Sequence, residues 1–120
     1  MRKFLAALAI AVGLIGSQVV VNPAHASWSQ CQTGQFCTWK GYTFTGDMYY
    51  YTYTPLCVEI GGTWDNKIVS LRNNTSHGVY IYNNHGCTTG GGVYLINPGV
   101  SYGDLWDIGA GWWISSIRFT

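Results

Sequence analysis

Apolar and polar residues alternate in short stretches along most of this chain, and turn-forming residues separate the stretches. No window shows the sustained period of an amphipathic helix. Paired glycines at 61–62 and a Pro-Gly pair at 98–99 mark tight turns. Short strands at regular spacing with turn signals between them are typical of an all-β sandwich. The predicted strands cover residues 36–40, 48–53, 57–60, 67–73, 78–82, 93–97 and 113–119, with residues 101–106 as a candidate for one more.

One stretch of the chain occurs twice. Residues 64–73 read WDNKIVSLRN and residues 111–120 read GWWISSIRFT, and matched positions lie 46 residues apart. A fixed internal period predicts two similar structural units. Each unit alone would leave an apolar face in water, so we expect two similar halves, at about 31–75 and 76–120, packed as one domain. The matched pairs are Ile68 with Ile114, Ser70 with Ser116, Leu71 with Ile117 and Arg72 with Arg118.

The first 26 residues have the pattern of a secretory signal peptide. Arg2 and Lys3 give a positive start, residues 4–15 are apolar, and residues 24–26 (AHA) offer the small side chains that a signal peptidase requires. The apolar run is shorter than the roughly 20 residues of a membrane-spanning helix. We therefore expect cleavage after residue 26 and a secreted, extracellular domain over residues 27–120.

Removal of that segment leaves 94 residues (120 − 26), enough for one small domain. Four Lys or Arg and five Asp or Glu give this part a net charge of −1, whereas the whole chain has +1. The absence of a basic patch in the sequence argues against nucleic acid and anionic membranes as partners. All six Trp and all nine Tyr lie in this part of the chain. We expect the domain to be a monomer.

All four cysteines also follow the predicted cleavage site. An even number of cysteines in a small exported chain predicts disulfides, here two, and four cysteines allow three pairings. We favour Cys31–Cys37, which closes a local loop, and Cys57–Cys87, which joins the two halves. A tetrahedral zinc site is the alternative interpretation, but the cysteine spacings do not match zinc-binding pairs.

Residues 39–46 (WKGYTFTG) match the Greek-key motif of the βγ-crystallins: an aromatic residue, four others, a second aromatic, one residue and then glycine. The resemblance implies a folded-back hairpin whose glycine takes a conformation that side chains oppose. In such motifs a later serine hydrogen-bonds the hairpin, a role that falls to Ser70 and, in the second half, to Ser116. The second half begins correctly with Tyr82, but Cys87 replaces the second aromatic. We therefore expect a disulfide to hold the second hairpin.

Further motifs follow the signal segment: an early cysteine pair around a five-residue loop, CTWKGYTFTG at 37–46, the Asn/Thr turn at 73–75, VYIY at 79–82 and WWISSIR at 112–118. With these motifs, most of the chain after residue 26 resembles a narrower group, the βγ-crystallin-like peptidase inhibitors of the Streptomyces metalloproteinase inhibitor type. This resemblance implies a Greek-key sandwich that acts as a secreted, non-enzymatic protease inhibitor, with metalloproteases as the expected targets.

Inhibitors of that group are thought to present a disulfide-anchored loop whose peptide carbonyl meets the metal of a zinc protease. The strand at 79–82 places the matching loop at 83–92 and the matching bond at Cys87–Thr88. Two features differ, because no second cysteine follows nearby and Thr88 is small and polar. The glycines at 90–92 are expected to add slack. The candidate inhibitory residues are His85, Gly86, Cys87, Thr88 and Thr89.

Calcium-binding βγ-crystallins carry two Asp or Asn residues, two free positions, Ser or Thr, and then Ser, and oxygen-rich loops suit this cation. Residues 65–70 keep the acidic pair without the first hydroxyl, and residues 111–116 keep the hydroxyls without the pair. Because the two loops exchange ligands in that family, the resemblance implies at most one weak site, from Asp65, the Lys67 carbonyl and Ser115. The alternative is an ordinary turn capped by Asp65, with no cofactor.

Tyr49, Tyr51 and Tyr53 alternate along a predicted strand and would share one face. Exposed aromatic rings can stack on sugar rings, so this face is a candidate surface for a cell-wall glycan. The alternative interpretation is that these rings fill the core of a small sandwich.

No catalytic arrangement is recognisable in the sequence. His77 and His85 lie in predicted turns without recognisable partners, and Asp104 and Asp107 flank a tryptophan with no second acidic cluster. We therefore predict that the protein is not an enzyme. The alternative to protease inhibition is a binding or structural module of the cell envelope, with or without calcium.

Overall fold

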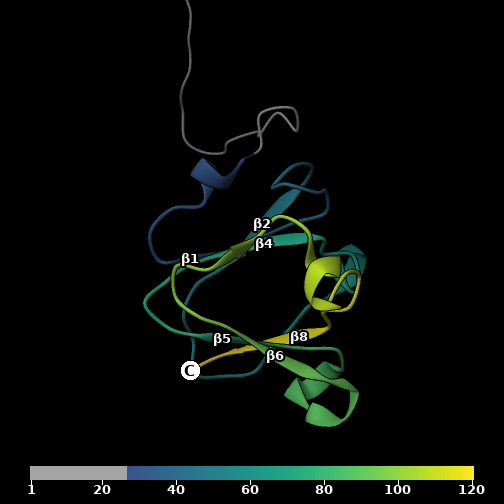
Figure 1. The fold of residues 1–120 in the computed structure, drawn as a ribbon. Helices are drawn as coiled ribbons and strands as arrows, with labels where there is room; N and C mark the ends of the chain where they lie inside the picture. The colour runs from purple at the N-terminus through teal and green to yellow at the C-terminus, as the bar shows by residue number, and fades with distance from the viewer. Residues whose placement is uncertain (1–26) are drawn as a thin grey trace, which may run out of the picture.

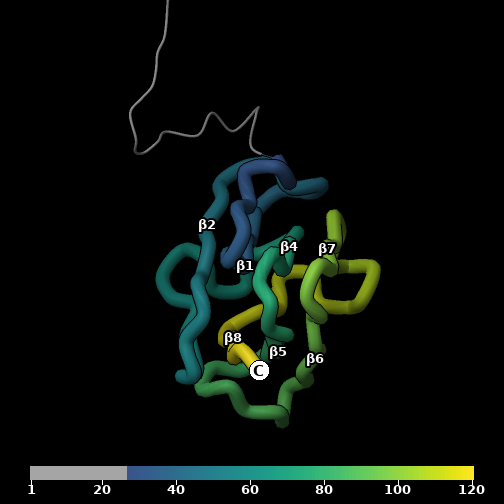
Figure 2. Tube along the Cα trace, turned by 90° about the vertical axis from the view of Figure 1, so that its left-hand side faces the viewer, coloured from purple at the N-terminus to yellow at the C-terminus, as the bar shows by residue number. Residues whose placement is uncertain are grey.

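The computed structural model describes residues 27–120 and contains two four-stranded antiparallel sheets packed face to face (Figure 1). The strands are β1 Gln35–Trp39, β2 Met48–Tyr51, β3 Val58–Glu59, β4 Ser70–Asn74, β5 Val79–Tyr82, β6 Val93–Ile96, β7 Ser101–Tyr102 and β8 Ser116–Phe119. The first sheet has the order β2-β1-β4-β7, and Figure 2 shows these strands in this order from left to right. The second has the order β3-β8-β5-β6. The predicted all-β sandwich is confirmed.

Each half of the chain lends one strand to the sheet of the other half. β3 from the first half pairs with β8 at the edge of the second sheet, and β7 from the second half pairs with β4 in the first. β1, β2 and β4 correspond in position to β5, β6 and β8, as the internal repeat predicted. Neither sheet is complete without a strand from the other half, so the two halves form one folding unit.

The core lies between the sheets and is built from the inward-facing residues of the alternating pattern. Phe36, Leu71, Ile81 and Ile117 come from four different strands, and none has exposed surface. Burial of one such side chain contributes about 1.5–3 kcal/mol, which makes this layer the main source of stability. The other buried members of the core are Ile60, Ile68, Val79, Ile96, Leu105, Ala110, Ile114 and Phe119.

The repeated strands are shorter than the sequence predicted. β4 and β8 begin at positions 70 and 116, three residues after the predicted starts at 67 and 113. The residues before them bond across the two halves instead: Asn66 donates its N–H to the carbonyl of Ile114, and Trp112 donates to that of Ile68. The entries to the two repeated strands are therefore joined to each other.

Short 3-10 helices occupy several connections. They are η3 Trp28–Gln30, η4 Gly62–Trp64, η5 His85–Cys87, η6 Thr89–Gly91 and η7 Leu105–Ile108. The eighth strand expected over 101–106 is limited to β7, because η7 begins soon afterwards. Within residues 27–120, no helix is long and apolar enough to cross a membrane. The expected signal peptide at 1–26 lies outside the described residues.

Candidate functional site

The first hairpin shows how the repeated serine holds a Greek-key turn. Ser70 is buried at the start of β4, donates its hydroxyl to the carbonyl of Gly41 at 2.7 Å and accepts the N–H of Phe44 at 3.1 Å. Phe44 has a φ of +60°, and its ring packs edge-on against Trp39 with the ring centroids 5.2 Å apart. The serine role that the Greek-key motif implied is therefore present.

The second hairpin is held by the same pair of hydrogen bonds. Ser116 donates its hydroxyl to the carbonyl of Asn84 and accepts the N–H of Cys87 at 2.9 Å. Cys87 has a φ of +54°, in the same left-handed region as Phe44. Cys87 thus takes the place of the second aromatic, as expected from the sequence.

Both predicted disulfides are present in the structure. Cys31 and Cys37 are joined with their Cα atoms 5.8 Å apart, and Cys57 and Cys87 with theirs 6.0 Å apart. The second bridge ties the loop between β5 and β6 to the residue just before β3, an edge strand of the same sheet. One covalent bond therefore replaces the ring packing of the first hairpin.

The loop between β5 and β6 is longer than its counterpart. In the first hairpin the N–H of Lys40 donates to the carbonyl of Asp47, seven residues later, and in the second the equivalent bond joins Asn83 to Gly92, nine residues later. The longer loop holds both η5 and η6. It also contains all five candidate inhibitory residues, so the structure places them in one loop between adjacent strands.

His85 at the loop tip lies between two carboxylates. Its Nδ1 is 2.9 Å from Oε1 of Glu59, and its Nε2 is 3.1 Å from Oδ2 of Asp65. The hydrogen bond with Glu59 is the main cause of a raised His85 pKa; desolvation opposes it, and Asp65 adds smaller contributions that raise the pKa further. Glu59 also accepts the N–H of Gly86 at 2.7 Å. The prediction that His85 lacks partners is therefore wrong. Both carboxylates lie far from His85 in sequence, and only the fold brings them near it.

The glycines that follow the loop tip are packed rather than slack. A Cβ at Gly91 would lie 2.6 Å from Oδ1 of Asn84, and one at Gly92 would lie 2.7 Å from the ring of Trp113. Asn83 also donates its side-chain amide to the carbonyl of Gly91 at 3.1 Å. Two of the three glycines are therefore needed for close approach, contrary to the slack expected from the sequence.

The tip of this loop is accessible to a partner. His85, Gly86, Thr88 and Thr89 are exposed, and only Cys87 is half-buried by its bridge. Thr88 has an extended backbone, with φ −98° and ψ 145°. The peptide bond between Cys87 and Thr88 thus follows a covalently anchored residue and leads into extended chain.

The residues proposed for calcium make other contacts. One carboxylate oxygen of Asp65 faces His85, and Ser115 donates its hydroxyl to the side-chain oxygen of Asn66 at 3.0 Å. The other oxygen of Asp65 is buried and has no hydrogen-bond partner among the described residues. No three His, Cys, Asp or Glu side chains in residues 27–120 are grouped to hold a metal. The site offers one free carboxylate oxygen, so the donor set fits calcium only in part.

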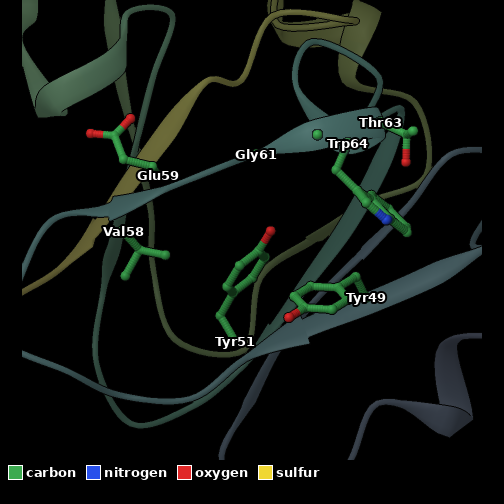
Figure 3. A pocket seen from close by; sticks show the side chains of 8 residues that line it. Tyr49, Tyr51, Val58, Glu59, Gly61, Thr63 and Trp64 are labelled. Carbon is green, nitrogen blue, oxygen red and sulfur yellow. The ribbon is translucent and has the colours of Figure 1, made fainter.

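The three tyrosines of the proposed glycan face do not stay together. Tyr49 and Tyr51 are neighbours, with ring centroids 5.1 Å apart, but Tyr53 follows the end of β2 and stacks on His77 at 4.1 Å. Trp64 is the third aromatic residue beside them, with its ring centroid 5.9 Å from that of Tyr49. Tyr49, Tyr51 and Trp64 line an open groove of about 550 Å³ together with residues 58–59 and 61–63 (Figure 3). Burial raises the pKa of Tyr51 to about 12.

Several solved structures with the same fold are described as βγ-crystallins. One, described as "Evolution of the eye lens beta-gamma-crystallin domain fold", is 17% identical, with a TM-score of 0.65 over 86% of this chain and 93% of that one. A βγ-crystallin from Ciona intestinalis is also 17% identical, with a TM-score of 0.61 over 72% of this chain and 100% of that one. A βγ-crystallin from an archaeon is 21% identical, with a TM-score of 0.58 over 74% and 100%. These likenesses confirm the predicted fold.

The comparison of sequences addresses activity as well. No curated protein matches the chain. The sequence model of peptidase inhibitor family I36 matches residues 24–95, more than half of the chain and the whole of the loop between β5 and β6. A family of inhibitors supports the prediction that the protein is not an enzyme. With the interlocked Greek-key sandwich already described, this match shows that the chain belongs to peptidase inhibitor family I36.

Proposed function

We propose that this protein is a secreted inhibitor of metalloproteases and that residues 85–89 form its inhibitory loop. Family membership supports a protease as the partner. The observation that carries the location is that three kinds of contact hold one exposed loop: a disulfide to Cys57, two hydrogen bonds to Ser116, and the carboxylates that face His85.

A braced loop suits inhibition for an energetic reason. A loop that is already ordered loses little conformational entropy when a protease binds it, so more of the contact energy appears as affinity. The Cys87–Thr88 peptide would enter the active site, with the Cys87 carbonyl toward the catalytic metal of the protease and the Thr88 side chain in the adjacent pocket. If this bond were cut, the Cys57 bridge and Ser116 would hold the Cys87 end in place.

Export of the protein is supported by two features. Disulfides persist in oxidising compartments, and both pairs of cysteines are bridged in this structure. The sequence of residues 1–26 adds the charge and apolar pattern of a secretory signal. An inhibitor that meets extracellular proteases would have to be outside the cell.

The test is a titration of purified residues 27–120 against a panel of secreted proteases that includes a thermolysin-like metalloprotease, a subtilisin-like serine protease and a papain-like cysteine protease. The expected result is stoichiometric, tight inhibition of the metalloprotease alone. Inhibition of the serine protease only would contradict the proposed target class. No inhibition of any protease would contradict the function itself.

A second candidate function, oligosaccharide binding, is favoured by the groove at Tyr49, Tyr51 and Trp64. A neighbouring hollow of about 360 Å³ shares Tyr49, Thr63 and Trp64 with it, so two depressions meet at one aromatic pair. The ammonium of Lys40 lies 4.7 Å from the Trp64 ring and 3.3 Å from the Thr63 hydroxyl, which places polar groups beside the rings. Calorimetry with soluble peptidoglycan fragments tests this function, and binding that is unchanged in Tyr49→Ala would exclude the groove.

A further inference from the structure

Trp112 has a backbone conformation that its side chain does not favour. Its φ is +55°, in the left-handed region that a bulky residue rarely enters. The internal repeat supplies a direct comparison, because Asn66 holds the equivalent position with a φ of +58°. Asparagine tolerates this region well. The fold thus has a low-strain solution at this position, and the second half does not use it.

Burial does not compensate for the strain at Trp112. The side chain is 57% exposed, whereas Ala110, two residues before it, and Ile114, two residues after it, are buried. The hydrogen bond from the Trp112 N–H to the carbonyl of Ile68 accounts for the backbone conformation but not for an exposed indole at this position. Strained residues cluster at binding and catalytic sites. The position of Trp112 therefore points to a contact outside this chain.

A second exposed tryptophan lies beside it. Trp106, in η7, is 49% exposed, and its ring centroid is 6.1 Å from that of Trp112. The Trp106 ring rests against Gly111, where a Cβ would collide with the indole. The Lys67 ammonium lies 5.3 Å from the Trp112 ring. These neighbours restrict both rings, so the pair, which we call the tryptophan patch, is a preorganised apolar surface.

The tryptophan patch is linked to the inhibitory loop by two short paths. On the first path, Asp65 faces His85 in the loop. Lys67 lies two residues after Asp65 in the chain, and its ammonium lies over the Trp112 ring. On the other path, Trp113 covers Gly92 at the end of the loop. Figure 1 shows the segment that contains η7 (yellow coil) and the loop that contains η5 and η6 (green coils) on the same side of the sandwich.

We propose that the tryptophan patch, Trp106 and Trp112, is a second contact surface for the protease whose active site receives the inhibitory loop. A stable protein complex buries about 800 Å² on each partner and uses roughly 20–30 residues a side, which a five-residue loop does not supply. Tryptophan is among the residues that contribute most when buried at an interface. The complementary surface on the protease is an apolar depression beside its active-site cleft. This inference rests on the proposed function.

The experiment compares four proteins: the parent domain, Trp112→Asn, Trp106→Ser and the control Tyr42→Asn. Trp112→Asn copies the repeat partner Asn66 and should leave the melting temperature unchanged or raise it. Tyr42 is 55% exposed at the apex of the first hairpin and serves as an exposed aromatic outside the patch. Inhibition constants and dissociation rates are measured on the protease that the parent inhibits.

The expected result is an inhibition constant at least tenfold weaker for both tryptophan variants, mostly through faster dissociation, with the control unchanged. If both variants inhibit like the parent, the patch is not a contact, and the proposed function still stands. Loss of inhibition in Trp112→Asn with a lowered melting temperature and full inhibition by Trp106→Ser would assign Trp112 a structural role and overturn the proposal. A parent that inhibits no protease would overturn the patch and the function together.

Discussion

Cys87 occupies in the second half of the molecule the position that Phe44 occupies in the first. Both residues have a left-handed backbone, with φ values of +54° and +60°, and both donate their N–H to the repeated serine. In the first hairpin the residue packs its ring on Trp39, and in the second it forms a disulfide to Cys57. One position of a repeated motif has thus become the covalent anchor of an exposed loop.

Ser116 and Ser70 offer a matched pair of variants. Replacing either serine with alanine leaves one carbonyl and one N–H without their partner, so each should lower the free energy of unfolding by about 1–2 kcal/mol. Only Ser116→Ala should also weaken inhibition, because only Ser116 braces the inhibitory loop. Denaturant unfolding and inhibition constants measure the two effects. Equal loss of inhibition in both variants would mean that general stability, not the loop, controls inhibition.

In the proposed inhibitory loop, Thr88 should determine how well the loop fills the adjacent protease pocket. Thr88→Leu adds net carbon and removes a hydroxyl, so binding should tighten by about 1–2 kcal/mol, roughly tenfold in the inhibition constant. Thr88→Asp should abolish inhibition because a buried, unpaired charge is costly. Thr45 is the corresponding residue after Phe44 in the first hairpin and Thr45→Leu is the control. If both Thr88 variants inhibit like the parent, the inhibitory contact is elsewhere.

His85 should make the stability of the domain depend on pH. Neutral imidazole donates through one nitrogen only, so contact with both carboxylates requires the protonated ring. Because the folded-state pKa is raised above the usual value of a histidine, this contribution is fully present below about pH 6.5 and is lost as pH rises through the folded pKa. Melting temperatures between about pH 5 and 9 should show this decline in the parent and lack it in His85→Gln. Parallel profiles would assign the decline to other groups.

The two disulfides should contribute unequally to stability. Cys57–Cys87 spans 30 residues and Cys31–Cys37 spans 6, and the chain-entropy model gives about 3–4 and about 2 kcal/mol respectively. Paired Cys→Ser variants, compared by denaturant unfolding, measure the difference. Alkylation without reductant, followed by mass spectrometry, should find no adduct on the parent domain. A stoichiometric adduct at Cys57 or Cys87 would contradict the bridge that anchors the loop.

Calcium should bind at a single weak site or not at all. Asp65 would supply one free carboxylate oxygen, and its other oxygen already faces His85. Calorimetry at millimolar calcium measures the stoichiometry and affinity, and Asp65→Asn, which removes the charge, is the matched variant. Two sites of micromolar affinity would show that the second loop supplies ligands despite Gly111 and Trp112 in place of an acidic pair.

The sequence by itself determined the architecture. Alternating apolar residues and regular turn signals predicted all eight strand regions, and the repeat of Ser70 in Ser116 predicted two equivalent hairpins. The sequence allowed three cysteine pairings, and the structure has the one that was favoured because it closes a local loop and joins the two halves. The strand pattern is local and the repeat is periodic, and such patterns can be recognised along a chain without knowing which distant residues meet.

The tertiary structure alone decided which side chains support the loop. Glu59 and Asp65 face His85 across 26 and 20 residues of chain, and nothing in their neighbourhoods in the sequence indicates this contact. In the same way, only the structure shows that Tyr53 packs on His77 instead of beside the other two tyrosines, and that Trp64 packs beside Tyr49. Such contacts depend on how loops from different strands converge at one end of a sandwich, and that convergence is set by the packing of the whole domain rather than by any single stretch of it.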